Sequence, residues 1–129
     1  MTPTPNGTLV VDVLGLRSRK GHLLAAVYAT PDGFPHDPGG ALRHLSEIID
    51  DDQMEVCFDG LPPGRYAVTV LHDEDDDGEL STNLLGIPTD GLGMSNFSTL
   101  AFRRPGFEAA SFDFMGGEVH IPVRIHYMS

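Results

Sequence analysis

The chain is poor in the residues that mark several large protein classes. One cysteine and no tryptophan occur in 129 residues, so Cys57 cannot form an intrachain disulfide. No run approaches the roughly 18 apolar residues of a membrane-spanning helix, which excludes membrane insertion by that route. Eight lysine and arginine residues face nineteen aspartate and glutamate residues, a net charge of −11. Because nucleic acids are bound by basic surfaces, this balance argues against a nucleic-acid partner and favours divalent cations.

The N-terminal residues also lack features of a targeting segment. Residues 1–7 have neither the basic nor the apolar region of a signal peptide, and we expect them to form a disordered lead. Residues 8–128 then form one domain. The chain is expected to be cytoplasmic, or periplasmic or secreted if a leader has been removed.

Fifteen glycines and ten prolines divide the chain into short elements, which is typical of all-β proteins. Apolar residues alternate with period two along several segments, and this pattern predicts strands. These segments are residues 8–14, 22–28, 54–58, 65–72, 107–114 and 118–127. About seven strands with Gly/Pro turns and one long ordered loop predict a single antiparallel β-sandwich.

Four local predictions accompany this fold. The first two strands are expected to pair as a hairpin across residues 15–21. Pro63 and Gly64 are expected at the centre of a type II turn, with Gly64 at positive φ. Residues 41–49 fit a helix and a non-helical segment equally well. Pro122 cannot donate to a ladder, so at that point the last strand should be an edge or be unpaired.

The residues that favour chemistry lie in an acidic loop after the strand 65–72. Asp73, Asp75 and Asp77 stand at positions 1, 3 and 5 of an Asp-x-Asp-x-Asp-Gly pattern, and the glycine allows the sharp bend. Glu79, at position 7, would contribute its carbonyl oxygen. Oxygen ligands at this spacing are typical of Ca²⁺ sites, and these four residues are the predicted metal ligands. Position 12 is Leu84 rather than glutamate, so an EF-hand is not expected.

The remaining ligands must come from elsewhere in the chain, and Asn83, Asp90 and Asn96 are the candidates. The alternative is a solvated acidic hairpin tip that binds no ion. Six acidic residues between positions 73 and 79 repel one another, which destabilises the loop unless a counter-charge is present. The following segment to residue 105 is too apolar for disorder, so a cation near its root would explain how it is held.

No catalytic or organic cofactor motif is evident. His72 at the strand end is a potential base or metal ligand, but a structural hydrogen-bonding role is the commoner fate of such a residue. His120 and His126 share a strand face, yet six strand residues span about 20 Å, so these two alone cannot share one metal. No catalytic residues are therefore predicted.

Three stretches of the chain resemble the bacterial family DUF2141. The first is residues 15–28 (GLRSRKGHLLAAVY). The second is residues 61–96, which run from LPPGRYAV through TNLLGIP to the Gly-rich segment that ends in SN. The third is the closing strand. The resemblance implies a transthyretin-like or immunoglobulin-like sandwich, commonly exported in Gram-negative bacteria, with no established activity. Where relatives often have asparagine, this chain has Asp76 and Asp77.

These features favour a non-catalytic β-sandwich whose calcium ion orders the 73–97 excursion, as a ligand-binding or adhesive module. The runner-up is a small-molecule-binding protein or hydrolase that uses His72 and neighbouring carboxylates beneath the Gly-rich loop. A third possibility is an acidic, metal-free interaction domain. A protein or carbohydrate partner is not identified by the sequence.

Overall fold

The computed structural model describes residues 6–34, 38–51, 53–74, 91–96 and 106–127. The strands are β1 (Gly7–Leu14), β2 (His22–Tyr28), β3 (Arg43–Ile48), β4 (Met54–Leu61), β5 (Gly64–Asp73), β6 (Gly91–Met94), β7 (Phe112–Phe114) and β8 (Glu118–Arg124). Two short helices accompany them, the 3₁₀ helix η1 (Pro38–Gly40) and α1 (Phe107–Ala110). In this part of the chain no helix is long and apolar enough to cross a membrane.

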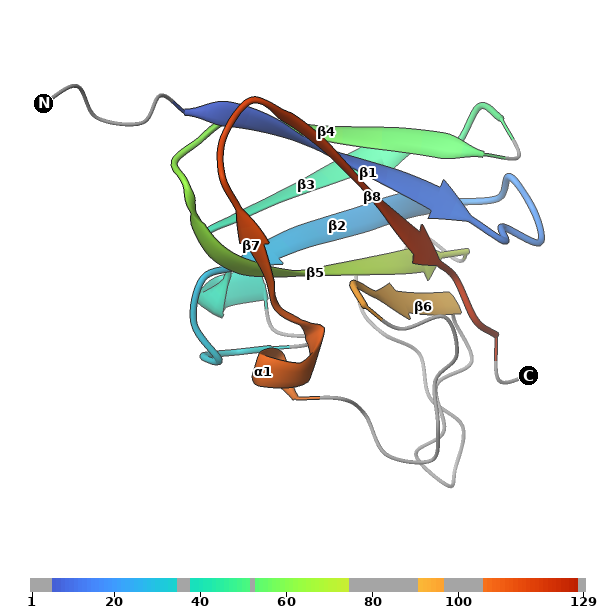
Figure 1. The fold of residues 1–129 in the computed structure, drawn as a ribbon. Coiled ribbons are helices and arrows are strands. Elements are labelled where there is room, and N and C mark those ends of the chain that lie inside the picture. Colours follow the sequence, from blue (N-terminus) through green and yellow to red (C-terminus); the bar gives the residue numbers. More distant parts are fainter. Residues whose placement is uncertain (1–5, 35–37, 52, 75–90, 97–105, 128–129) are drawn as a thin grey trace, which may run out of the picture.

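The strands form two layers, as Figure 1 shows. One sheet has the order β4-β1-β8, and the other has the order β3-β2-β5-β6 with β7 also paired to β5. All pairs are antiparallel except β1 with β8, which are parallel. The predicted all-β sandwich is therefore confirmed.

The core lies between the two sheets and is built from the period-two positions. Alternate residues of each strand point inward, as the sequence pattern predicts, because successive side chains of a strand face opposite sides. The largest fully buried side chains include Tyr28, Phe58, Phe114, Leu9, Leu23, Leu61 and Met94. Five inward residues of the last predicted strand (Val119, Ile121, Val123, Ile125 and Tyr127) also pack into this cluster.

The predicted β1–β2 hairpin is wrong. β1 pairs with β4 and β8, whereas β2 pairs with β3 and β5, so the connection 15–21 passes from one sheet to the other. Gly21 permits this crossing, because its φ is +71° and a Cβ there would overlap the Asp73 carbonyl group. Burial on one face of each strand is compatible with either arrangement, so periodicity alone did not distinguish them.

The predicted type II turn is also wrong. Gly64 is not among the glycines with positive φ, and it begins β5, while Gly60 within β4 has a φ of 69°. β4 and β5 lie in different sheets, so Pro62 and Pro63 form a link between layers rather than a hairpin turn.

The structure decides one open prediction and corrects another. The segment 41–49 contains strand β3, which resolves the open choice between helix and non-helix. The predicted strand 107–114 divides into α1 and β7, with Ser111 in extended conformation between them. Pro122 lies on β8, whose described ladder partner is β1 alone, and this agrees with an edge position.

Strand β6 was missed by the sequence analysis. It has only four residues, two of which are glycines and carry no side chain for a periodic pattern. The glycines are required by packing, because a Cβ on Gly91 would overlap Ile125 and Tyr127. Beside them, Leu92 exchanges backbone hydrogen bonds with His126 and links the edges of the two sheets.

Candidate functional site

The acidic loop begins where β5 ends and the chain returns to the same sheet in β6. The register pairs His72 with Gly91, so the residues on either side of the loop lie beside each other. Asp73 is the last residue of β5 and is 2% exposed. The other three predicted ligands (Asp75, Asp77 and Glu79) lie outside the described residues.

His72 is fully buried and both of its ring nitrogens have protein partners. Nε2 lies 2.8 Å from the Lys20 carbonyl oxygen, and Nδ1 lies 2.6 Å from the Tyr127 hydroxyl oxygen. A carbonyl oxygen only accepts, so Nε2 carries the proton and Nδ1 accepts from the tyrosine. The Arg17 backbone N–H donates to the same hydroxyl at 3.1 Å. Neither nitrogen is left to bind a metal or to act as a base, so His72 has the structural role.

The residue after Asp73 is held by the connection between β1 and β2. Glu74 accepts hydrogen bonds from Arg17 Nε at 3.0 Å and from Ser18 Oγ at 2.8 Å. The Arg17 guanidinium also lies 4.3 Å from the centroid of the Tyr127 ring, a cation–π contact. The hydrogen bond from Arg17 lowers the pKa of Glu74, while burial raises the pKa of Tyr127. The loop therefore leaves the sheet with its first side chains fixed.

Of the three additional ligands suggested for the loop, the structure describes Asn96 alone. Asn83 and Asp90 lie outside the described residues. Asn96 donates from Nδ2 to the Ser111 carbonyl, and the neighbouring Ser95 N–H bonds to Val68. Val68 and Asp73 are five residues apart on β5, a distance of about 17 Å along a strand. Asn96 therefore cannot share an ion with Asp73, and that suggestion is wrong.

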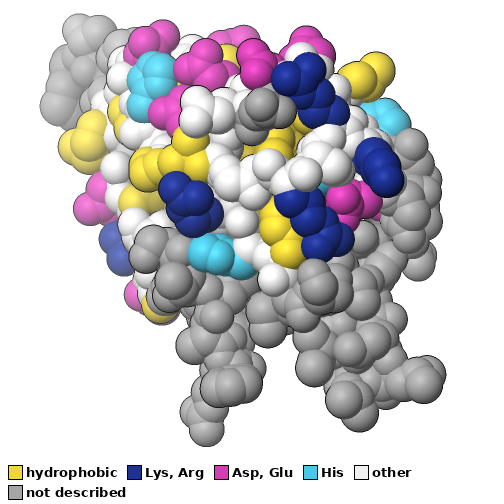
Figure 2. Space-filling model, turned by 90° about the vertical axis from the view of Figure 1, so that its right-hand side faces the viewer, with side chains coloured by type: hydrophobic (Ala, Val, Ile, Leu, Met, Phe, Trp, Pro, Cys, Tyr) yellow, Lys and Arg dark blue, Asp and Glu magenta, His cyan; other side chains and the backbone are white. Residues whose placement is uncertain are grey.

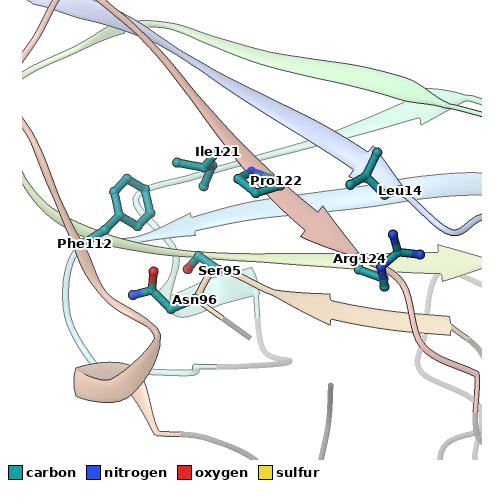
Figure 3. A pocket seen from close by; sticks show the side chains of 7 residues that line it. All are labelled: Leu14, Ser95, Asn96, Phe112, Ile121, Pro122 and Arg124. Atoms are coloured by element: carbon teal, nitrogen blue, oxygen red, sulfur yellow. The ribbon is translucent and has the colours of Figure 1, made fainter. Parts of the chain in front are cut away.

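A cavity of about 360 Å³ opens between the edges of the two sheets (Figure 3). It is lined by Leu14, Ser95, Asn96, Phe112, Ile121, Pro122 and Arg124. Arg124 is the one titratable side chain among these lining residues, and Ser95 Oγ is already bonded to Val68 N–H and the Ala110 carbonyl. The lining thus offers apolar surface and one cation, without an acid–base pair.

A second group of polar side chains lies on the outer face of the β4-β1-β8 sheet. Asp12, Glu55 and His120 come from three neighbouring strands, and one potential ligand atom of each lies within 4.8 Å of the others. The hydrogen bond to Glu118, with the neighbouring Asp12, raises the pKa of His120. The sequence analysis missed this group because the pairing of distant strands creates it; the outward alternation of each strand was its only sequence signal.

Comparison with family models relates the chain to a group of bacterial proteins. The family model described as "Uncharacterized protein conserved in bacteria (DUF2141)" matches residues 11–122. Neither the curated proteins nor the solved structures gave a match. The matched range includes the acidic loop, its root on β5, and most of both sheets.

Proposed function

The chain belongs to the DUF2141 family of uncharacterised bacterial proteins, and on this premise we propose that it is a non-catalytic domain that binds calcium. The ion is held by the Asp-x-Asp-x-Asp-Gly loop, with Asp73, Asp75 and Asp77 as carboxylate ligands and Glu79 as a carbonyl ligand. The domain acts outside the cytoplasm, in the periplasm, and its calcium-ordered loop forms a ligand-binding or adhesive surface.

The difference between Asp73 and Glu74 at the start of the loop carries this proposal. Asp73 is 2% exposed, whereas the Glu74 carboxylate accepts hydrogen bonds from Arg17 and Ser18. In a loop of this pattern the first residue is a ligand and the second is not. The loop also starts from the β5–β6 ladder, so part of the entropy cost of ordering it for an ion is already met.

The surroundings of His72 support binding rather than hydrolysis. A general base needs a nitrogen free to accept a proton from a substrate or a water molecule. Here Nδ1 accepts from Tyr127 and Nε2 donates to Lys20 in a fully buried site. The runner-up, a hydrolase centred on His72, therefore lacks its base.

A calcium-dependent unfolding measurement tests the proposal. Chelator-stripped protein is melted with and without millimolar CaCl₂, with MgCl₂ as the ion control. If the dissociation constant is one hundredth of the added calcium, linkage predicts about 2.7 kcal/mol of stabilisation, which raises Tm by several degrees. The variant Asp75→Ala should lose this rise, while Asp50→Ala, at an exposed residue between β3 and β4, should keep it.

Two results would overturn the calcium proposal. No rise with either ion would leave an acidic, metal-free interaction domain. An equal rise in the wild type and in Asp75→Ala would place the ion elsewhere.

The cavity favours a second candidate function, the binding of a small organic anion. Its volume lies within the range of ligand pockets, with Arg124 supplying a cation at one end and Phe112 and Ile121 supplying apolar surface at the other (Figure 3). Benzoate, used as a probe, should shift the NMR signals of these residues in the wild type and not in Arg124→Gln. Equal shifts in both proteins would remove this candidate.

A further inference from the structure

The outer face of the β4-β1-β8 sheet brings three ligand-type side chains to one point. Asp12 on β1 is the antiparallel register partner of Glu55 on β4. On the other side of β1, His120 on β8 is the partner of Val10, one outward position before Asp12. Figure 2 shows acidic and histidine side chains gathered along its upper rim, the side on which this sheet lies in Figure 1.

The two separations that involve His120 Nδ1 are close to those of a tetrahedral zinc site, and the Asp12 and Glu55 ligand atoms lie within 4.8 Å of each other. His120 Nδ1 lies 3.4 Å from Asp12 Oδ2 and 3.9 Å from Glu55 Oε2. Zinc bonds to histidine nitrogen and carboxylate oxygen are about 2.0–2.2 Å, so two ligands of a tetrahedron are about 3.3–3.6 Å apart. Asp12 already meets this spacing. The Glu55 side chain is 65% exposed and has the freedom to close the small remaining gap.

A fourth residue fixes the orientation of the imidazole. His120 Nε2 lies 3.2 Å from Glu118 Oε2, and an ionised carboxylate only accepts hydrogen bonds. Nε2 therefore carries a proton, and a neutral imidazole presents its Nδ1 lone pair to Asp12 and Glu55. Histidine ligands in zinc sites commonly donate their second N–H to a carboxylate in this way.

We propose that Asp12, Glu55 and His120 bind a zinc ion through Oδ2, Oε2 and Nδ1, with Glu118 as the residue that positions the imidazole. An imidazole nitrogen beside two carboxylates suits zinc better than the hard cations Ca²⁺ and Mg²⁺, which prefer oxygen ligands alone. The three ligands leave the fourth tetrahedral position to water or to a donor atom of another molecule. This site shares no residue with the proposed calcium loop.

The competing explanation is an ion cluster without a metal. Both His120 nitrogens face carboxylates, and a doubly protonated imidazole would satisfy the same neighbours. A proton on Nδ1 would occupy the ligand position, so the ion cluster predicts no saturable zinc binding at pH 8. The zinc site predicts saturable binding under the same conditions.

The test is a calorimetric titration of the chelator-stripped full chain with ZnCl₂ at pH 8. The wild type should show one saturable site per chain, and His120→Gln, Asp12→Asn and Glu55→Gln should each weaken zinc binding at least tenfold. Glu118→Gln should weaken it by about 10–100-fold, the usual effect of losing such a partner. In NMR spectra of the histidine rings, zinc should move the His120 Nδ1 signal most.

Two control variants make the titration decisive. His44→Gln removes an exposed histidine on β3 of the other sheet, and it should leave zinc binding unchanged. Asp75→Ala should also leave it unchanged, because the acidic loop is a separate site. The proposal is overturned if the wild type shows no saturable zinc site, or if His120→Gln binds zinc as tightly as the wild type. Loss of the site in Asp75→Ala alone would assign the ion to the loop and also overturn it.

Discussion

Replacing Tyr127 by phenylalanine should destabilise the fold through one buried atom. The phenyl ring keeps the packing and the cation–π contact with Arg17, so only the hydroxyl group is lost. Its removal leaves His72 Nδ1 without its hydrogen-bond donor in a fully buried site. An unsatisfied buried polar group costs about 1–3 kcal/mol, so we expect a loss of about 2 kcal/mol in the free energy of unfolding.

Urea unfolding followed by circular dichroism measures this loss in the presence of chelator, since the chain has no tryptophan. The m-value for urea should stay unchanged. In a thermal melt of the same two proteins, Tm should fall by roughly 8 °C. Tyr66→Phe is the matched control. The Tyr66 hydroxyl donates to the carbonyl of Pro62, an exposed residue, so water can replace it and the cost should be about 1 kcal/mol or less.

The same variant has a pH signature. Burial raises the pKa of Tyr127 above the ordinary tyrosine value of 10.0, so the folded state holds the phenol proton more tightly than the unfolded state. This contribution is fully present below pH 10 and is lost as the pH rises through the folded-state pKa. Tyr127→Phe should therefore unfold with a shallower alkaline slope than the wild type. A Tyr127→Phe stability within about 0.5 kcal/mol of the wild type, or equal to that of Tyr66→Phe, would refute the buried hydrogen bond.

Three further perturbations test other parts of the structure. Glu74→Gln should cost about 1 kcal/mol at pH 7, because the pKa of this carboxyl is lowered in the fold. The difference from the wild type should shrink as the pH falls from the ordinary glutamate value of 4.5 through the lower folded-state pKa, and a difference that does not shrink in this range would contradict this. Gly21→Ala should be strongly destabilising in thermal unfolding, since its φ is +71° and a Cβ would overlap backbone, whereas Gly106→Ala meets no atom within 4 Å and should change stability by less than about 0.5 kcal/mol; similar losses would refute the steric explanation. Burial and the neighbouring Asp59 raise the pKa of the Cys57 thiol, so its labelling rate should have a midpoint above 9.0; a lower midpoint would contradict this.

Much of the fold follows from alternation in the sequence. β1, β2, β4, β5 and β8 were predicted because alternate apolar residues of each face the core, although β5 is buried on both faces. The pairing of β1 with β8 was not predicted, since alternation identifies a buried face and says nothing about which strand lies beside it. β6 was missed for a different reason, because Gly91 and Gly93 are needed for close packing and leave no hydrophobic pattern.

The candidate sites also differ in how far local sequence could predict them. Asp73 and His72 are neighbours in the sequence, so the root of the acidic loop could be located from local spacing. The roles of the two differ in the fold, because Lys20 and Tyr127 occupy both nitrogens of His72 and their approach depends on long-range packing. The group on the outer face of the β4-β1-β8 sheet depends entirely on strand register, and no local motif contains it.

The parallel pairing of β1 with β8 has a consequence for how the chain folds. β1 (Gly7–Leu14) is the central strand of its sheet, yet one of its two neighbours is β8 (Glu118–Arg124), which is synthesised last among the described strands. Closing so long a loop before any contact forms is entropically costly, and sandwiches dominated by such contacts fold in milliseconds to seconds. Until β8 arrives, one edge of β1 is open to strands of other chains. The growing chain is therefore exposed to aggregation until nearly all of the domain has been made, and a chaperone would have its greatest effect in that interval.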